Sequence, residues 1–323
     1  MIVPLLNEVD HVATLVGDIA AQDFEGEVEV FVADGGSTDG SVARLREDAE
    51  RAGVDATVVD NPRRFVSPGL NACLDRASGD LIVRLDCHSR YPSEYFRLCA
   101  RAAEETGAWN VGGVVLADGE TPTERAVACA MASPFGGIGW TRHASTHERA
   151  EVDTVTYGAF RREAFDRAGL FDETLVRNQD DELNARLRAA GGRIVLDPSI
   201  QVRYRPRGSL RAVYRQYFEY GLWKVPVMLK HRRALSARSL APVAFVASLA
   251  GLALASPWSQ TTRKALATEL ALYATFATAF AASSVSARDE EWRLVPRTVA
   301  VFPAFHLGYG VGMIRGWLGA AFR

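Results

Sequence analysis

The sequence predicts an α/β fold with a mainly parallel sheet covered by helices on both faces, followed by C-terminal membrane-associated helices. Three observations predict it. Short apolar runs alternate with helical segments as far as residue 206, polar residues follow several of these runs directly, and the composition changes near residue 207. Near-continuous apolar strands separated by helices are typical of parallel sheets that are buried on both faces.

The expected elements alternate along the chain, beginning with residues 1–6 as the end of a buried strand. The other strands are expected at 28–33, 56–59, 81–85, 111–116 and 193–196, and the helices at 11–20, 41–51, 70–77 and 95–106. In parallel sheets of this kind, ligands bind beyond the carboxyl ends of the strands. Polar residues directly after a strand are therefore the first candidates for chemistry.

Charge and cysteine content exclude several classes of protein. The chain has 37 basic and 39 acidic residues and a formal net charge of −2, so no nucleic-acid partner is expected. The four cysteines lack Cys-x-x-Cys spacing, which indicates free thiols in a reducing compartment. The amino terminus lacks the basic region of a signal peptide, so we expect the catalytic part to remain in the cytosol.

Three parts are expected along the chain: a catalytic domain at 1–206, an amphipathic interfacial segment at 207–238 and a membrane-associated helical tail at 239–323. The interfacial segment mixes Tyr and Trp with Arg and Lys, a composition that suits the headgroup region of a membrane. Two apolar stretches of the tail, 240–258 and 265–285, are each about as long as a bilayer is thick.

The flanking charges predict the orientation of this tail. Arg232, Arg233 and Arg238 lie on the amino-terminal side of the first apolar stretch. By the positive-inside rule they keep the catalytic domain on the cytoplasmic side of the membrane. A third apolar stretch, 299–318, is interrupted by Pro303 and several glycines. The alternative to a membrane tail is a buried helical hairpin that packs on the soluble domain.

A glycine-rich turn at residues 34–40 reads DGGSTDG and lies between an expected strand and an expected helix. A glycine such as Gly35 lets the backbone approach a ligand closely, and Asp34 can accept hydrogen bonds from a base or a ribose. The turn is neither a Walker A sequence nor GxGxxG, so a nicotinamide cofactor has little support. The structural alternative is a strand-to-helix turn with a good helix cap.

A second motif, Asp86-Cys87-His88, follows the strand expected at 81–85. Asp86 and His88 project to the same side of an extended segment. Together with diphosphate oxygens and waters, they can hold a divalent cation such as Mn²⁺ or Mg²⁺, which neutralises charge on a departing diphosphate. The alternative is an exposed loop pair without a ligand.

A third motif, NQDDE at residues 178–182, opens a further helix. Acidic residues in the first turn of a helix are commonly there for the helix dipole alone. That explanation accounts for one or two of Asp180, Asp181 and Glu182 better than for all three. A carboxylate here can also act as a general base towards a sugar hydroxyl, because the helix terminus keeps it ionised at neutral pH.

Taken together, these motifs resemble those of inverting glycosyltransferases of family 2, which have the Rossmann-like GT-A fold. The matching order is PLLNE at 4–8, DGGSTDG at 34–40, GD at 79–80, DCH at 86–88, GAFRR at 158–162, GLFDE at 169–173 and DDEL at 180–183. The resemblance covers residues 1–205. Within the family, the Asp-x-His form and QYFEYG at 216–221 resemble the succinoglycan-biosynthesis type.

The resemblance implies a donor site. Its nucleotide-sugar pocket would be lined by Pro4, Glu8, Asp34, Gly35 and Asp86. Asp34 would contact the base, and Asp86 would lie at the ribose and the diphosphate. His88 would occupy the metal-ligand position that the last Asp of a DxD motif usually holds, so a divalent cation is expected as cofactor.

The resemblance also implies a base and an acceptor side. Asp180 matches the second acid of the family's Glu-Asp pair and is the candidate catalytic base. Gln179 departs from the pattern, because the family more often has Glu there. Asp181 and Arg161 are expected, with Gln179, on the acceptor side or next to the base. A single in-line displacement would invert the anomeric configuration without a covalent glycosyl-enzyme.

The implied partners are a nucleotide-diphosphate sugar, with UDP as the expected carrier, and a lipid-linked or growing glycan acceptor in polysaccharide synthesis. A processive polysaccharide synthase is one alternative, although the tail lacks that group's Gln-x-x-Arg-Trp motif and offers few spans for a channel. A non-catalytic nucleotide-sugar-binding scaffold is the other. Retention of Asp86, His88 and Asp180 argues against a scaffold, since a binding module needs no general base.

Overall fold

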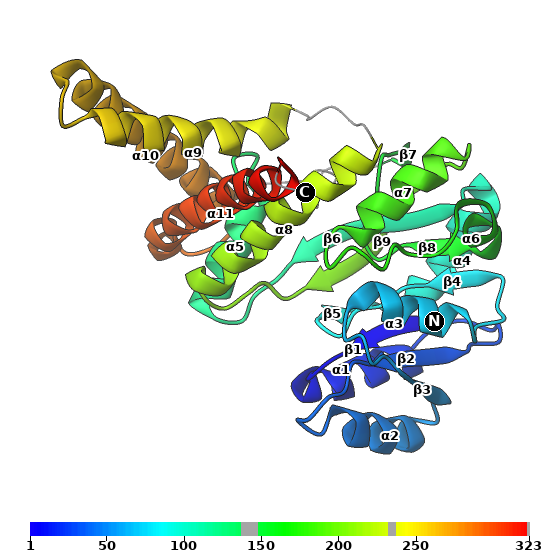
Figure 1. Cartoon of the computed structure of the whole chain (residues 1–323). Coiled ribbons are helices and arrows are strands. Elements are labelled where there is room, and N and C mark those ends of the chain that lie inside the picture. Colours follow the sequence, from blue (N-terminus) through cyan, green and yellow to red (C-terminus); the bar gives the residue numbers. More distant parts are fainter. Residues whose placement is uncertain (137–147, 232–236, 322–323) are drawn as a thin grey trace. The chain divides into compact units, whose positions relative to one another are not determined.

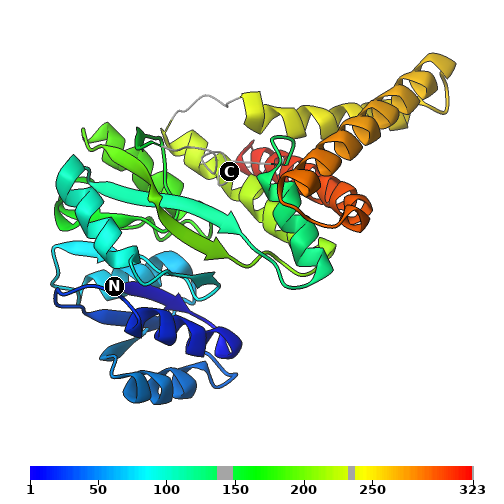
Figure 2. The same cartoon turned by 180° about the vertical axis from the view of Figure 1, so that it is seen from behind.

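The computed structural model describes residues 1–136, 148–231 and 237–321, which divide into two compact units (Figures 1 and 2). The first unit comprises Met1–Leu116 and His143–Tyr204, and the second comprises Ala117–Arg142 and Arg205–Arg323.

The first unit opens with a three-stranded parallel sheet. Its strands are β1 (Ile2–Leu5), β2 (Val30–Asp34) and β3 (Ala56–Asp60), in the order β1-β2-β3. The helices between and after them are α1 (Val9–Ala20), α2 (Ser41–Ala52) and α3 (Val66–Leu74). As Figure 1 shows, α1 and α2 cover one face of this sheet and α3 covers the other.

Alternation along the strands explains why both faces are covered, since successive side chains point to opposite sides. Ile2, Ala33 and Val59 belong to one apolar cluster with Leu70 and Cys73 of α3. The intervening side chains are also apolar, so the sheet has no face suited to water. The sequence-based prediction of an α/β fold is confirmed.

A second sheet of six strands completes the first unit. Its strands are β4 (Leu81–Val83), β5 (Ser89–Arg90), β6 (Asn110–Ala117), β7 (Ala150–Glu151), β8 (Ala159–Arg161) and β9 (Ile194–Tyr204), and its helices are α4 (Tyr95–Thr106), α6 (Arg162–Ala168) and α7 (Gln179–Ala189). The order is β4-β8-β6-β9-β5, with β7 beside β9.

The direction of the strands differs between the two sheets. The pairs β4–β8, β6–β8, β5–β9 and β7–β9 are antiparallel. A parallel bridge between Ile2 and Arg84 joins β1 to the chain directly after β4. The parallel part of the fold is therefore β1–β3 with this bridge, and it brings the carboxyl ends of β1, β2 and β4 to one edge.

The second unit is helical. It contains α5 (Pro122–Ala132), α8 (Leu210–His231), α9 (Ala237–Ala255), α10 (Gln260–Ala287), a 3₁₀ turn (Trp292–Leu294) and α11 (Val295–Ala321). Helix α5 packs against α10 and α11, although it interrupts the chain of the first unit. Residues 232–236, part of the predicted interfacial segment, lie outside the described residues.

Helices α8 and α11 lie side by side and run parallel. A Cβ atom built on Gly308 would lie 2.7 Å from the carbonyl oxygen of Tyr214, and one on Gly312 would lie 2.1 Å from that of Phe218. Residue numbers rise by four in both helices from the first contact to the second, so the two helices run in the same direction. Glycines spaced by four residues allow two helix backbones to approach this closely.

Helices α9 and α10 form a hairpin. The rings of Phe245 and Tyr273 stack with centroids 4.6 Å apart, and the Ser248 hydroxyl donates to the Glu269 carboxylate. Among the described residues, α10 is the one helix long and apolar enough to cross a membrane. Helix α9 is apolar over Ser239–Ala255 but shorter, so one of the two expected bilayer-length stretches reaches full length.

Candidate active site

The loops after β1 and β2 are tied together by reciprocal hydrogen bonds. The backbone N–H of Asn7 donates to the Ser37 hydroxyl, and the N–H of Thr38 donates to the Asn7 side-chain oxygen, both at 2.9 Å. Asn7 has a φ of 55°, a left-handed conformation that asparagine tolerates better than most residues. This link fixes where α1 begins.

The first turn of α1 obtains its capping groups from the start of α2. The N–H of Glu8 donates to the Ser41 hydroxyl at 2.7 Å, and the N–H of Val9 donates to the Asp39 carboxylate at 3.1 Å. A helix start needs such partners for its free N–H groups. Because other residues supply them, the Glu8 carboxylate is not used as a cap.

Asp34 and Gly35 lie at the carboxyl end of β2, as predicted. The Asp34 carboxylate accepts the N–H groups of Gly36 at 3.2 Å and of Ser37 at 3.0 Å, so it holds the glycine-rich turn. A Cβ atom on Gly35 would lie 3.3 Å from the Leu6 side chain, tighter than most real contacts. A carboxylate has about four acceptor positions, so the turn-holding role leaves Asp34 able to bind a ligand as well.

Glu8, His11 and His88 form a cluster of potential metal ligands. His88 Nε2 lies 2.9 Å from a Glu8 carboxylate oxygen, and the His11 ring meets the His88 ring edge-on with centroids 4.6 Å apart. Each residue is half-buried, and their potential ligand atoms lie within 4.8 Å of one another. His11 had no role in the sequence-based prediction, although its i, i+3 spacing from Glu8 on a helix was readable.

Asp86 lies beside this cluster without being part of it. Its carboxylate accepts the backbone N–H of His88 at 3.1 Å, and its own N–H donates to the buried Tyr91 hydroxyl at 2.7 Å. Burial raises the pKa of the intervening Cys87 thiol well above its usual value, and the carboxylates of Asp86 and Glu8 add to the effect. Cys87 is therefore a protonated thiol, neither a thiolate ligand nor a nucleophile.

An ion pair between Arg84 and Asp180 connects the end of β4 to the start of α7. The Arg84 side chain is 6 % exposed and that of Asp180 21 %. Burial alone would lower the pKa of Arg84, but the Asp180 and Asp86 carboxylates outweigh it and raise that pKa, so the guanidinium stays charged. The pair holds Asp180 at Arg84, which precedes Asp86 by two residues in the segment after β4. Sequence analysis gave Arg84 no role, although a charged residue in an apolar strand was a signal.

Two atoms of this pair lack a hydrogen-bond partner within the described part of the chain, Asp180 Oδ1 and Arg84 Nε. An unsatisfied buried carboxylate oxygen is costly, so a ligand hydroxyl at Oδ1 would supply a missing hydrogen bond. Beside Asp180 on the first turn of α7, Gln179 is buried and Asp181 half-buried.

Glu182, the third acid of the run, has a structural role. It is fully buried and pairs with Arg186 at 2.8 Å. The same guanidinium donates to the carbonyl oxygen of Leu170 at 2.7 Å, which anchors the loop before α7. Two of the three acids therefore pair with arginines of different parts of the chain, Glu182 with Arg186 of α7 and Asp180 with Arg84.

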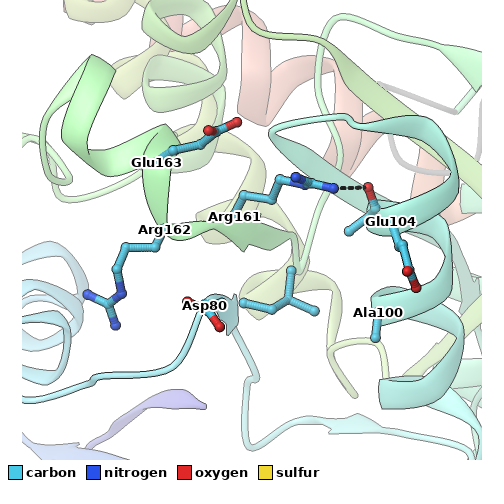
Figure 3. Close-up of a pocket in the computed structure, with 8 residues that line it drawn as sticks. Asp80, Ala100, Glu104, Arg161, Arg162 and Glu163 are labelled. Carbon is cyan, nitrogen blue, oxygen red and sulfur yellow. Dashed lines mark hydrogen bonds between the residues drawn. The ribbon is translucent and has the colours of Figure 1, made fainter.

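Arg161 does not lie with the other predicted site residues. It pairs in register with Leu81 at the start of β4, whereas the site follows the end of that strand. Its guanidinium donates to the carbonyl oxygen of Ala103 at 2.8 Å, and both residues line a hollow of ≈ 380 Å³ (Figure 3). The structure therefore does not bring Arg161 together with the other predicted site residues, and the residue bonds to the C-terminal part of α4.

The chain resembles known proteins in sequence. Residues 1–169 match the family described as glycosyl transferase family 2. The chain is 32% identical over 260 residues, 77% of either chain, to the succinoglycan biosynthesis protein ExoA of Rhizobium meliloti (strain 1021). It is 24% identical over 236 residues, 69% of this chain and 72% of the other, to a dolichyl N-acetyl-α-D-glucosaminyl phosphate 3-β-D-2,3-diacetamido-2,3-dideoxy-β-D-glucuronosyltransferase of Methanococcus voltae.

The chain also resembles a solved structure, that of the mannosyltransferase PcManGT from Pyrobaculum calidifontis in complex with GDP-Man and Mn²⁺. The TM-score is 0.66 at 21% sequence identity, with 97% of this chain and 86% of that one covered. At this identity the likeness concerns the fold.

Proposed function

Because the chain belongs to glycosyltransferase family 2 and has the GT-A fold, we propose that it moves one sugar from a nucleotide-diphosphate donor to a glycan acceptor with inversion. The observation that carries the proposal is the Arg84–Asp180 ion pair, which brings the candidate base to the edge where Glu8, Asp86 and His88 lie. UDP is the expected carrier.

The donor half of the proposed site is built from the strand ends. Asp34 and Gly35 would receive the nucleoside with Pro4 and Glu8, and Asp86 would lie at the ribose and the diphosphate. Asp86 and His88 would hold a divalent cation such as Mn²⁺ or Mg²⁺, and the Glu8 carboxylate beside His88 offers a further donor. When bound, such a cation neutralises charge that develops on the departing diphosphate.

Asp180 performs the proton transfer in this proposal. Its carboxylate takes the proton of an acceptor hydroxyl, whose oxygen attacks the anomeric carbon as the bond to the diphosphate breaks. Arg84 holds the other carboxylate oxygen and so orients the base. Gln179 and Asp181 flank the base on α7 and would contact the acceptor.

The names of two relatives support a lipid-linked or growing glycan as the acceptor. One is named for succinoglycan biosynthesis, and the other for transfer to a dolichyl-phosphate-linked sugar. The described residues contain one helix that is apolar and long enough to cross a membrane, which is too few to form the channel of a processive synthase. Transfer of a single sugar is therefore the better-supported reaction.

Calorimetric titration of the detergent-solubilised chain tests the donor site. We expect UDP to bind only with Mn²⁺ or Mg²⁺ present, and Asp86→Ala to abolish the binding because it removes the acceptor at the ribose and the diphosphate. Asp181→Asn, on the acceptor side, is the control and should bind UDP as the wild type does. If the folded protein binds none of UDP, GDP and dTDP with any cation, the enzyme proposal gives way to a scaffold.

We further propose that the protein is bound to the cytoplasmic membrane through the α9–α10 hairpin, with the catalytic unit in the cytoplasm. Helix α8 carries charged residues throughout and does not qualify as a span, and α11 packs parallel to it. If α10 crossed alone, α8 and α11 would end on opposite sides of the bilayer, which their packing forbids. In this proposal α9 therefore crosses the membrane together with α10.

The dimensions of the hairpin suit a bilayer. Helix α9 has 19 residues, and the buried residues of α10 begin at Ala277. At about 1.5 Å per residue, each arm reaches close to the thickness of a hydrocarbon core of about 30 Å. Leu254 and Trp258, near the turn, are 71% and 84% exposed in the protein alone. The polar turn and Trp258 would then lie at the far interface.

Cysteine labelling tests this topology, since all four native cysteines are buried. A membrane-impermeant maleimide should label Gln260→Cys, at the hairpin turn, from outside intact cells. It should label Gln201→Cys, on an exposed position of β9, only after the cells are opened. Labelling of Gln260→Cys only in opened cells would show that the hairpin does not cross, and external labelling of Gln201→Cys would reverse the orientation.

A further inference from the structure

The cluster of Glu8, His11 and His88 contains a ligand that the proposed reaction does not use. The donor site needs Glu8 and His88, whereas His11 has no part in it. Yet the ligand atoms of all three lie within 4.8 Å of one another. Donors about 2.1 Å from one ion lie up to about 4.2 Å apart, so a slight rotation of one ring lets a single ion contact all three.

The cluster is held by its surroundings before any ion binds. Glu8 and His11 lie on the first turn of α1, whose backbone is fixed by Ser41 and Asp39. His88 is fixed through its N–H, which the Asp86 carboxylate accepts. A metal site needs supporting contacts of this kind to hold its ligands in place.

The chemistry of the donor set selects the ion. Two imidazoles and one carboxylate suit Zn²⁺, Co²⁺ and other transition metals, whereas Mg²⁺ prefers oxygen ligands. We propose that Glu8, His11 and His88 form a binding site for one Zn²⁺ or Co²⁺ ion, which binds without any nucleotide.

The site has a regulatory consequence that rests on the proposed function. An ion held by all three side chains occupies Glu8 and His88, which the donor and its Mn²⁺ or Mg²⁺ also require. Zn²⁺ then inhibits sugar transfer in competition with the nucleotide sugar. His11 distinguishes the Zn²⁺ or Co²⁺ site from the donor site, because only the Zn²⁺ or Co²⁺ site includes it.

Cobalt is the probe that tests the site, because the visible absorption bands of Co²⁺ change when imidazole replaces water as a ligand, whereas Mg²⁺ and Zn²⁺ have no such bands. The full chain, in detergent and without a polyhistidine tag, is titrated with Co²⁺ in the absence of nucleotide. We expect one equivalent to bind, Zn²⁺ to displace it and Mg²⁺ in excess to leave it in place. His11→Ala should weaken Co²⁺ binding at least about tenfold, as loss of a ligand does.

Asp10→Asn is the matched control, since Asp10 is an exposed acid on the same helix turn and lies outside the cluster. It should bind Co²⁺ like the wild type. The proposal is overturned if His11→Ala, shown by thermal unfolding to be folded, retains wild-type affinity, or if Mg²⁺ displaces Co²⁺. Because no nucleotide is present, failure here is separate from failure of the UDP titration.

Discussion

Replacing Asp180 by asparagine is expected to lower the turnover number of sugar transfer by about 10² to 10⁴-fold, the usual contribution of a general base. Asparagine keeps the shape of the side chain and still accepts a hydrogen bond from Arg84, but it cannot take a proton from the acceptor hydroxyl. Binding of UDP with Mn²⁺ should persist, because the proposed reaction assigns Asp180 to the acceptor half of the site. Initial rates and calorimetric titration measure the two effects separately.

The control for this prediction is Asp181→Asn, one residue further along the same helix turn. It removes the same charge from the first turn of α7, so any effect of the helix dipole is common to both variants. We expect its turnover number to fall far less. Equal turnover of the two variants, each shown to be folded by thermal unfolding, would exclude Asp180 as the base.

Replacing Arg84 by methionine is expected to lower the free energy of unfolding by about 3 kcal/mol, near the lower end for a broken buried ion pair. Methionine retains an apolar stem but leaves the Asp180 carboxylate without its counter-charge. Asp180 is 21 % exposed, so water compensates part of the loss. Denaturant unfolding of the chain in detergent measures the change. The same substitution should also lower turnover, because the base loses its orienting partner.

The double variant Arg84→Met/Asp180→Asn separates the ion pair from other effects of each change. It leaves neither charge unpaired, so we expect it to recover about 1 to 3 kcal/mol relative to the sum of the single losses. Arg44→Met is the surface control, since Arg44 is 46% exposed in its pair with Asp48 and such pairs contribute less than about 1 kcal/mol. Strictly additive losses would mean that the Arg84–Asp180 contact does not stabilise the fold.

The sequence predicted the elements of the first unit well where their signals are local. The helix expected at 95–106 is α4, Tyr95–Thr106, and the strand expected at 56–59 lies within β3. The antiparallel direction of the strands in the second sheet could not be predicted from local signals. The β4–β8 pair joins two strands of three residues each from distant parts of the chain, and such short runs carry no pattern that names their partner.

The placement of α5 was equally hidden. Its capping box of Thr121 and Glu124 marks where the helix begins, which is a local signal. Its partners are in the tail: Cys129 packs with Val285 and Leu294, and Arg125 pairs with Glu290. An apolar face predicts that a helix is covered, but it does not predict which part of the chain covers it. From sequence alone, α5 was therefore assigned to the predicted catalytic domain, residues 1–206.

By itself the sequence determined the fold class, the family and the two loops of the proposed donor site, because these depend on residues close together in the chain. The turn at Asp34 and Gly35 and the segment at Asp86 and His88 follow strands whose apolar runs are visible directly. Only the tertiary structure decided which side chains meet. It joined Arg84 to Asp180 across 96 residues, added His11 to Glu8 and His88, and moved Arg161 to the opposite end of β4. Contacts of this kind follow from strand pairing and helix packing, whose geometry is set by the whole core rather than by any local run of residues.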